Sequence, residues 1–205
     1  MRILFAVARL AAGALGLAAV IATYAAAQMP INPFNFFGYF TIQGNIVFLI
    51  VILIAAAFGF AGRTQPGWLL FLRAAATYMI IVGLVYNTLL IGLAGGVAVP
   101  WANHVLHVVI PIYALLDWLL FGDRPPLPWR RFWFVLIYPL VWLGVVLIRV
   151  GTDGMAFYPF LNFNKIGGGA TALYCIAIAI GFAVFGLVVW ALSRVHILKP
   201  GRIPA

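Results

Sequence analysis

The chain alternates between long apolar runs and short connections that are rich in proline and charged residues, such as "GRTQPG" and "GDRPPLPWRR". A helix that crosses a membrane needs about 20 mostly apolar residues. Six runs meet this length, at roughly residues 3–27, 36–61, 68–93, 99–121, 131–150 and 168–195. The pattern therefore predicts an all-α polytopic membrane protein, in which residues 1–205 form a single domain of six transmembrane helices.

The composition agrees with a lipid environment. Hydrophobic residues make up 66% of the chain and charged residues only 7%, whereas a soluble domain has about 25% charged residues. The net charge of +9 does not indicate nucleic-acid binding, because no basic arm and no soluble domain are left outside the spans. The single cysteine, Cys175, excludes an intrachain disulfide.

The positions of lysine and arginine predict the orientation. Two basic residues, Arg149 and Lys165, fall on one side of the predicted spans. Ten fall on the other: Arg2, Arg9, Arg63, Arg73, Arg124, Arg130, Arg131, Arg194, Lys199 and Arg202. Because cytoplasmic loops carry the excess of basic residues, we expect both termini in the cytoplasm. The basic side is also expected to contact anionic lipid headgroups.

The first predicted span has some features of a secretory signal peptide. It is basic at its start, rich in alanine and ends on an A-x-A pattern. Arg9 interrupts its apolar run, so we expect the segment to be retained as a span. Cleavage would leave five spans without inverting the others.

The fourth span contains the polar group "PWANHVLHVVIP", with Asn103, His104 and His107. An ionisable residue inside a span is a functional hypothesis by default. Residues three and four apart share a helix face, so these three side chains are expected on one face. At about 1.5 Å rise per residue, His107 would lie roughly 12 Å below the outer end of its span.

A second polar group, "GYFTIQGN", lies at the outer end of the second span and holds Thr41, Gln43 and Asn45. Thr41 would lie roughly 8 Å inside its span, at a depth similar to that of His107. An imidazole that accepts the threonine proton makes the hydroxyl a usable nucleophile. Asn45, Asn103 or a backbone amide would then donate to an oxyanion.

Other interpretations remain open at this stage. Polar side chains often hydrogen-bond between membrane helices as packing contacts. Histidine pairs also bind metals, but the only other candidate ligands are Cys175 and Asp117, and Asp117 would lie about 15 Å from His107 along the helix axis. A bis-histidine haem would need His196, at the cytoplasmic end of the sixth span. We therefore expect neither a metal nor a cofactor.

Transport is the main rival function. Asn87 and Asp117 would extend a polar route inward from His107, and polar residues at depth also mark ion paths. The simpler interpretation of Asp117 is an ion pair with Arg73 or Arg124 near the cytoplasmic interface. A membrane scaffold without enzymatic activity is the third possibility.

Three stretches in order, "YFTIQGN", "WANHVLHVVIP" and "GMAFYPFLN", resemble the androgen-induced and androgen-dependent TFPI-regulating membrane proteins and their bacterial six-span relatives. Characterised members are intramembrane threonine hydrolases of fatty acid esters of hydroxy fatty acids. The resemblance implies a lipid substrate drawn from the bilayer, a bacterial inner-membrane location, Thr41 as nucleophile and His107 as the catalytic histidine. Tyr158 matches a family motif without an assigned role.

One position departs from the family pattern. The animal proteins carry an acidic residue three positions after the threonine, where this chain has Gly44. An amide, from Gln43 or Asn45, would have to replace any role of that acid. A lipid ester also requires an apolar cavity, for which the expected lining residues are Phe37, Phe40, Tyr86 and Tyr158.

Overall fold

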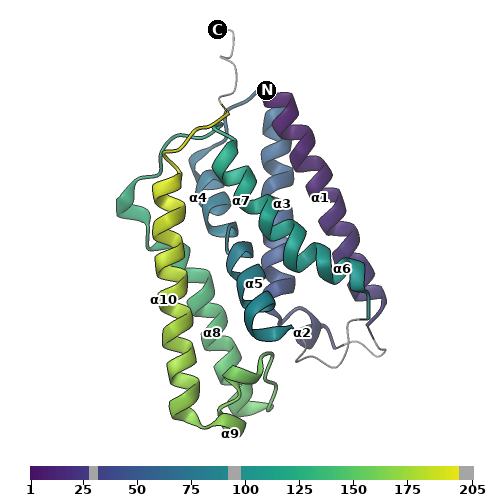
Figure 1. Ribbon diagram of the computed structural model, residues 1–205, viewed down its shortest axis with the longest axis vertical. Helices are drawn as coiled ribbons and strands as arrows, with labels where there is room; N and C mark the ends of the chain where they lie inside the picture. The colour runs from purple at the N-terminus through teal and green to yellow at the C-terminus, as the bar shows by residue number, and fades with distance from the viewer. Residues whose placement is uncertain (28–31, 92–97, 199–205) are drawn as a thin grey trace.

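The computed structural model describes residues 1–27, 32–91 and 98–198 (Figure 1). Regular structure in these ranges is helical, apart from one isolated bridge between Phe121 and Leu198. Six helical segments are long and apolar enough to cross a membrane: Arg2–Ala25, Phe40–Phe60, Gly67–Leu90, Pro100–Leu120, Trp129–Thr152 and Gly168–Leu192. The predicted all-α architecture with six candidate membrane spans is therefore confirmed.

Three of the six segments are single α-helices, α1 (Arg2–Ala25), α3 (Phe40–Phe60) and α10 (Gly168–Leu192), and the fifth consists mainly of one long α-helix, α8 (Phe134–Thr152). Helix α1 packs along α3, and α10 packs on α8. The remaining spans lie between these two pairs, and the segment after α10 returns to the end of the bundle that holds the N-terminus (Figure 1). Large apolar side chains remain exposed on the outer helices, for example Ile148 and Leu173, as expected for surfaces that face lipid.

The two middle spans are not continuous α-helices. The third consists of α4 (Gly67–Ala76), α5 (Met79–Val85) and a π-helical turn, η1 (Tyr86–Leu90). The fourth consists of α6 (Pro100–His104), a π-helical turn, η2 (Val105–Val109), and α7 (Ile110–Leu120). Single π turns inside α-helices frequently occur at functional sites, and here the two turns lie in neighbouring spans.

Short helices connect the longer ones. They are α2 (Pro33–Phe36), η3 (Trp129–Arg131), η4 (Pro159–Leu161) and α9 (Phe163–Ile166). The segment before α2 starts a capping turn, because the Asn32 side chain accepts from the backbone N–H groups of Phe34 and Asn35. This turn makes α2 a separate element, so that α3 begins only at Phe40.

Four charged residues form a buried cluster at the N-terminal end of the bundle. The Arg9 guanidinium, which has no exposed surface, donates to Asp117 at 2.7 Å and to both carboxylate oxygens of Asp123 at 2.5 and 3.0 Å. Arg73 donates to Asp117 at 2.7 Å and to Asp123 at 3.2 Å. Asp117 therefore pairs with Arg73, one of its two expected partners, and also with Arg9. The charges are balanced, which is how buried ions are normally accommodated.

Candidate functional site

Thr41 and His107 line the same cavity, which has a volume of about 520 Å³. Its other lining residues are Thr23, Phe36, Tyr39, Ile42, Tyr86, Leu90, Ala156, Phe157, Tyr158, Pro159, Asn162 and Lys165. The hydroxyl and the imidazole make no hydrogen bond to each other, and both border the same space. Hydrogen bonds between catalytic groups are often long without substrate and tighten in the complex.

Thr41 is the second residue of α3. The predicted span began at about residue 36, but residues 33–36 form α2 and α3 begins only at Phe40. The first N–H groups of an α-helix have no carbonyl partner within it, and Tyr39, the residue before α3, provides no side-chain cap. Thr41 is thus placed at a helix terminus whose backbone amides favour negative charge.

Tyr158 lies at this same helix terminus. Its side chain is buried, and its pKa is raised by that burial, while the neighbouring Thr41 side chain and the backbone of Thr41 and Phe40 act in the opposite direction. The phenol therefore stays protonated at neutral pH. Groups that lower the pKa of a tyrosine do so by donating to its oxygen, so the Tyr158 oxygen lies within reach of the Thr41 hydroxyl and of the backbone N–H groups of Thr41 and Phe40.

His107 is held by two residues from two spans. Its Nδ1 lies 3.0 Å from the Asn103 carbonyl oxygen, and its ring stacks on Tyr86 with centroids 3.8 Å apart. A carbonyl oxygen can only accept, so Nδ1 carries the proton in the neutral ring and Nε2 keeps its lone pair. The Asn103 amide donates to the Tyr86 hydroxyl at 2.6 Å. Asn103 therefore positions both rings.

The π turn that carries His107 follows from the sequence. Pro111, four residues after His107, has no N–H to donate to the His107 carbonyl. The Asn87 amide donates to that carbonyl instead, at 3.2 Å. The Asn45 amide lies 3.4 Å from the carbonyl of Leu106, the preceding residue. Asparagine side chains from two other spans thus contact the backbone carbonyls that lack a partner because of the proline.

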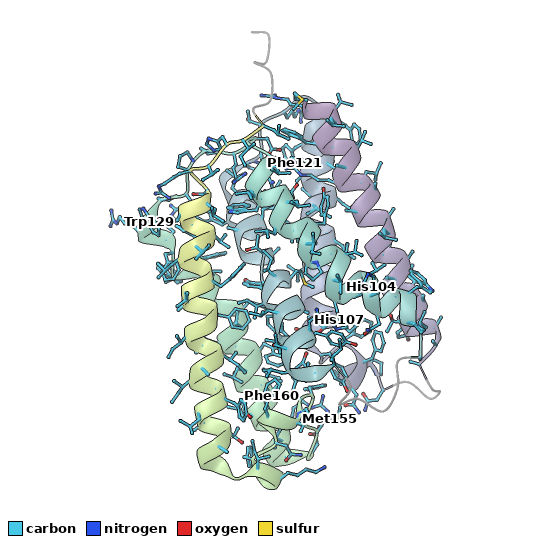
Figure 2. The ribbon with its side chains drawn as sticks, viewed as in Figure 1. His104, His107, Phe121, Trp129, Met155 and Phe160 are labelled. Atoms are coloured by element: carbon cyan, nitrogen blue, oxygen red, sulfur yellow. The ribbon has the colours of Figure 1, made fainter. Side chains whose placement is uncertain are left out.

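His104 and His107 were expected on one helix face, but His104 does not line the cavity that His107 borders. His104 is exposed, whereas His107 lies deeper toward the middle of the bundle (Figure 2). The expectation assumed α-helical winding. A π turn winds more widely, with hydrogen bonds from i to i+5, so residues three apart no longer overlie one another.

The amides of Asn45 and Gln43 are occupied elsewhere. Asn45 has no exposed surface and donates to the Thr41 carbonyl at 2.8 Å. Gln43 donates to the Phe37 carbonyl at 2.6 Å and accepts from the Tyr138 hydroxyl at 2.6 Å. Both residues hold the backbone around Thr41, and the structure gives neither of them a position in the cavity.

Aromatic residues form much of the cavity wall. Tyr86 and Tyr158 line it as expected. Phe40 instead lines an adjoining apolar void of about 60 Å³, whose wall also includes Thr41 and Tyr158. Phe37 is exposed and lines neither space. Thr41 therefore lies where a larger cavity and a narrow apolar void meet.

Lys165 and Asn162 were not singled out by sequence analysis, yet both line the larger cavity. Lys165 was recognised only as one of two basic residues on its side of the spans. The contribution of these residues depends on how the connection between α8 and α10 folds back over the bundle, and no short motif encodes that path. Among the described residues, no group of three or more His, Cys, Asp or Glu side chains is arranged to hold a metal ion.

Comparisons with protein-family models, with curated proteins and with solved structures give no match to this chain.

Proposed function

We propose that this protein is an intramembrane hydrolase of lipid esters, with Thr41 as nucleophile and His107 as general base. The observation that carries the proposal is that both side chains line one cavity with largely aromatic and aliphatic walls. The resemblance of the two motifs to the threonine hydrolases named above supports the same assignment. It suggests fatty acid esters of hydroxy fatty acids as the first substrates to test.

In the acylation step, Thr41 Oγ attacks the ester carbonyl carbon and its proton moves to His107 Nε2. The tetrahedral oxyanion then collapses, the alcohol leaves with the proton from His107, and the acyl group stays on Thr41. In the second half, His107 takes a proton from water, which attacks the acyl carbonyl. Thr41 leaves with that proton, and the free acid is released.

Of the oxyanion donors in this proposal, the backbone amide was one of the sequence-based alternatives and Tyr158 was not. The Tyr158 hydroxyl and the first backbone amides of α3 are adjacent to Thr41, while the Asn45 amide donates to the backbone. Donors fixed before the reaction in a water-poor site stabilise the transition state most effectively. We therefore assign the oxyanion to Tyr158 and the α3 terminus.

The path inward from His107 favours hydrolysis over transport. Ile110 and Ala114, which follow His107 along α7, are buried apolar residues. Asp117, farther along the helix, is held in the cluster with Arg9 and Arg73. A hydrolase needs polarity at one depth, whereas a transporter needs it along a route through both leaflets.

A covalent probe tests the nucleophile directly. The purified protein in lipid nanodiscs is incubated with an alkyl fluorophosphonate. An activated hydroxyl attacks the phosphorus of this probe, fluoride leaves, and the phosphonate stays on the hydroxyl oxygen. Peptide mass spectrometry should place the adduct on Thr41, with none in Thr41→Ala and slower labelling in His107→Ala. Labelling that is equal in wild type and Thr41→Ala contradicts the assignment.

A further inference from the structure

The end of the bundle that holds the N-terminus contains a second cavity, of about 250 Å³, with polar walls. It lies between the start of α1, the end of α3 and the connections that follow α3 and α7. The lining residues are Arg2, Gly59, Arg63, Thr64, Gln65, Gly122, Asp123, Arg124 and Pro125. None of them borders the Thr41 cavity.

The charges around this cavity do not cancel. Arg9 and Arg73 are balanced by Asp117 and Asp123 in the buried cluster. Gln65 also donates to Asp123, at 2.7 Å, so the Asp123 carboxylate is already saturated with donors. Within the described part of the chain, the three arginines that line the cavity, Arg2, Arg63 and Arg124, form no ion pair with a carboxylate.

Arg124 is the most unusual of the three. It is only 4% exposed, and its guanidinium donates to the carbonyls of Phe121, Trp118 and Leu192 and stacks over the Trp118 ring at 4.2 Å. Its Nε atom is buried without a hydrogen-bond partner. A buried charge without a counterion is costly, and a bound anion would remove that cost.

Arg2 and Arg63 have the freedom to close on such an anion. The Arg2 guanidinium makes one long hydrogen bond, 3.4 Å, to the Gly62 carbonyl. Arg63 is exposed. Two guanidinium groups with few hydrogen bonds and one fixed group in the wall are a suitable set for an anion with several oxygen atoms.

We propose that this cavity binds a phosphate group, carried by an anionic phospholipid headgroup or free in solution. The planar fork of arginine matches the oxygen atoms of phosphate. The cavity is smaller than most ligand pockets, which have about 300–1,000 Å³, and it suits a headgroup rather than acyl chains. It also lies at the basic end of the bundle, where anionic lipids of the cytoplasmic leaflet are expected.

The test uses the full chain in neutral detergent and does not depend on ester hydrolysis. Phosphatidylglycerol or phosphatidylcholine is titrated while bound lipid is counted by native mass spectrometry. In a parallel arm, inorganic phosphate is compared with chloride at equal ionic strength by thermal unfolding. The test variant is Arg2→Gln/Arg63→Gln. The control is Arg130→Gln/Arg131→Gln, which removes two exposed arginines of η3, in the connection between α7 and α8, and none that lines this cavity.

We expect phosphatidylglycerol to bind the wild type and to lose about tenfold in affinity in Arg2→Gln/Arg63→Gln, with less than about twofold loss in the control. If phosphate alone stabilises the wild type and displaces the lipid, free phosphate is the ligand. If only the lipid acts, the headgroup is the ligand. The proposal is overturned if both variants lose the same affinity for phosphatidylglycerol. It is also overturned if the wild type prefers neither phosphatidylglycerol over phosphatidylcholine nor phosphate over chloride.

Discussion

The imidazole of His107 and the phenol of Tyr86 lie face to face, with ring centroids 3.8 Å apart and planes inclined by 23°. Each ring belongs to a π turn of a different span, and Asn103 hydrogen-bonds to both. The structure thus orients His107 by stacking and by a backbone carbonyl. Asp117, the acidic residue farther along the same span, is engaged by two arginines, so the proposed unit is a dyad.

Substitution of either dyad residue should greatly slow ester hydrolysis. We expect kcat to fall by about 10²–10⁴-fold, because Thr41→Ala removes the nucleophile and His107→Ala removes its general base. The double variant should be no worse than the more damaged single one, since the two residues act as a unit. His104→Ala is the matched control, because His104 is exposed and borders no cavity. Wild-type rates in both single variants would contradict the dyad.

Tyr158→Phe should lower kcat with little change in KM. Loss of one oxyanion donor typically costs about 10²–10³ in kcat, while the ring that packs against Trp142 and Phe160 is kept. Steady-state kinetics on a soluble ester and the thermal midpoint of unfolding are measured together. Tyr174→Phe, on an exposed tyrosine, is the control. Full activity in Tyr158→Phe would show that the Tyr158 hydroxyl does not stabilise the oxyanion and that the backbone amides alone do so.

The sequence is sufficient to predict the six spans, because each is a long apolar run that lipid requires to be helical. The two motifs were also expected to lie near each other, and Thr41 and His107 border one cavity. The sequence-based predictions departed from the structure where uninterrupted α-helical periodicity was assumed. A π turn separates His104 from His107, and a capped turn at Asn32 moves the start of α3 to Phe40.

The buried position of Arg9 was missed for a different reason. A basic residue near the start of a span usually reaches the interface with its long side chain, and the distribution of basic residues alone gave no reason to place it elsewhere. Its partners, Asp117 and Asp123, lie more than 100 residues away in the sequence. Only the packing of α1 beside α7 makes these contacts possible.

Pro111→Ala should reduce hydrolysis without unfolding the protein. Alanine restores the N–H that the His107 carbonyl lacks, so the span can return to α-helical winding and rotate His107 away from Tyr86. We expect the thermal midpoint to be unchanged or higher and kcat to fall. The control is Pro139→Ala, which removes a proline from the interior of α8 and so measures the general effect of losing a proline within a span. Pro139 also lines the small apolar void. Unchanged kcat in Pro111→Ala would show that the π turn is not needed for catalysis.

Arg9→Met should destabilise the bundle more than any substitution at an exposed arginine. Methionine keeps much of the side-chain volume but leaves Asp117 and Asp123 with Arg73 as their only cationic partner in the cluster. Removing one member of a buried ion pair costs about 3–5 kcal/mol, because an uncompensated charge remains. Arg9→Met/Asp117→Asn restores the balance of one positive and one negative charge, so part of the loss should be recovered. Thermal unfolding in one detergent measures all variants, with Arg2→Met as the control from the same helix. If the double variant is less stable than Arg9→Met alone, hydrogen bonding by Asp117, rather than charge balance, holds the cluster together.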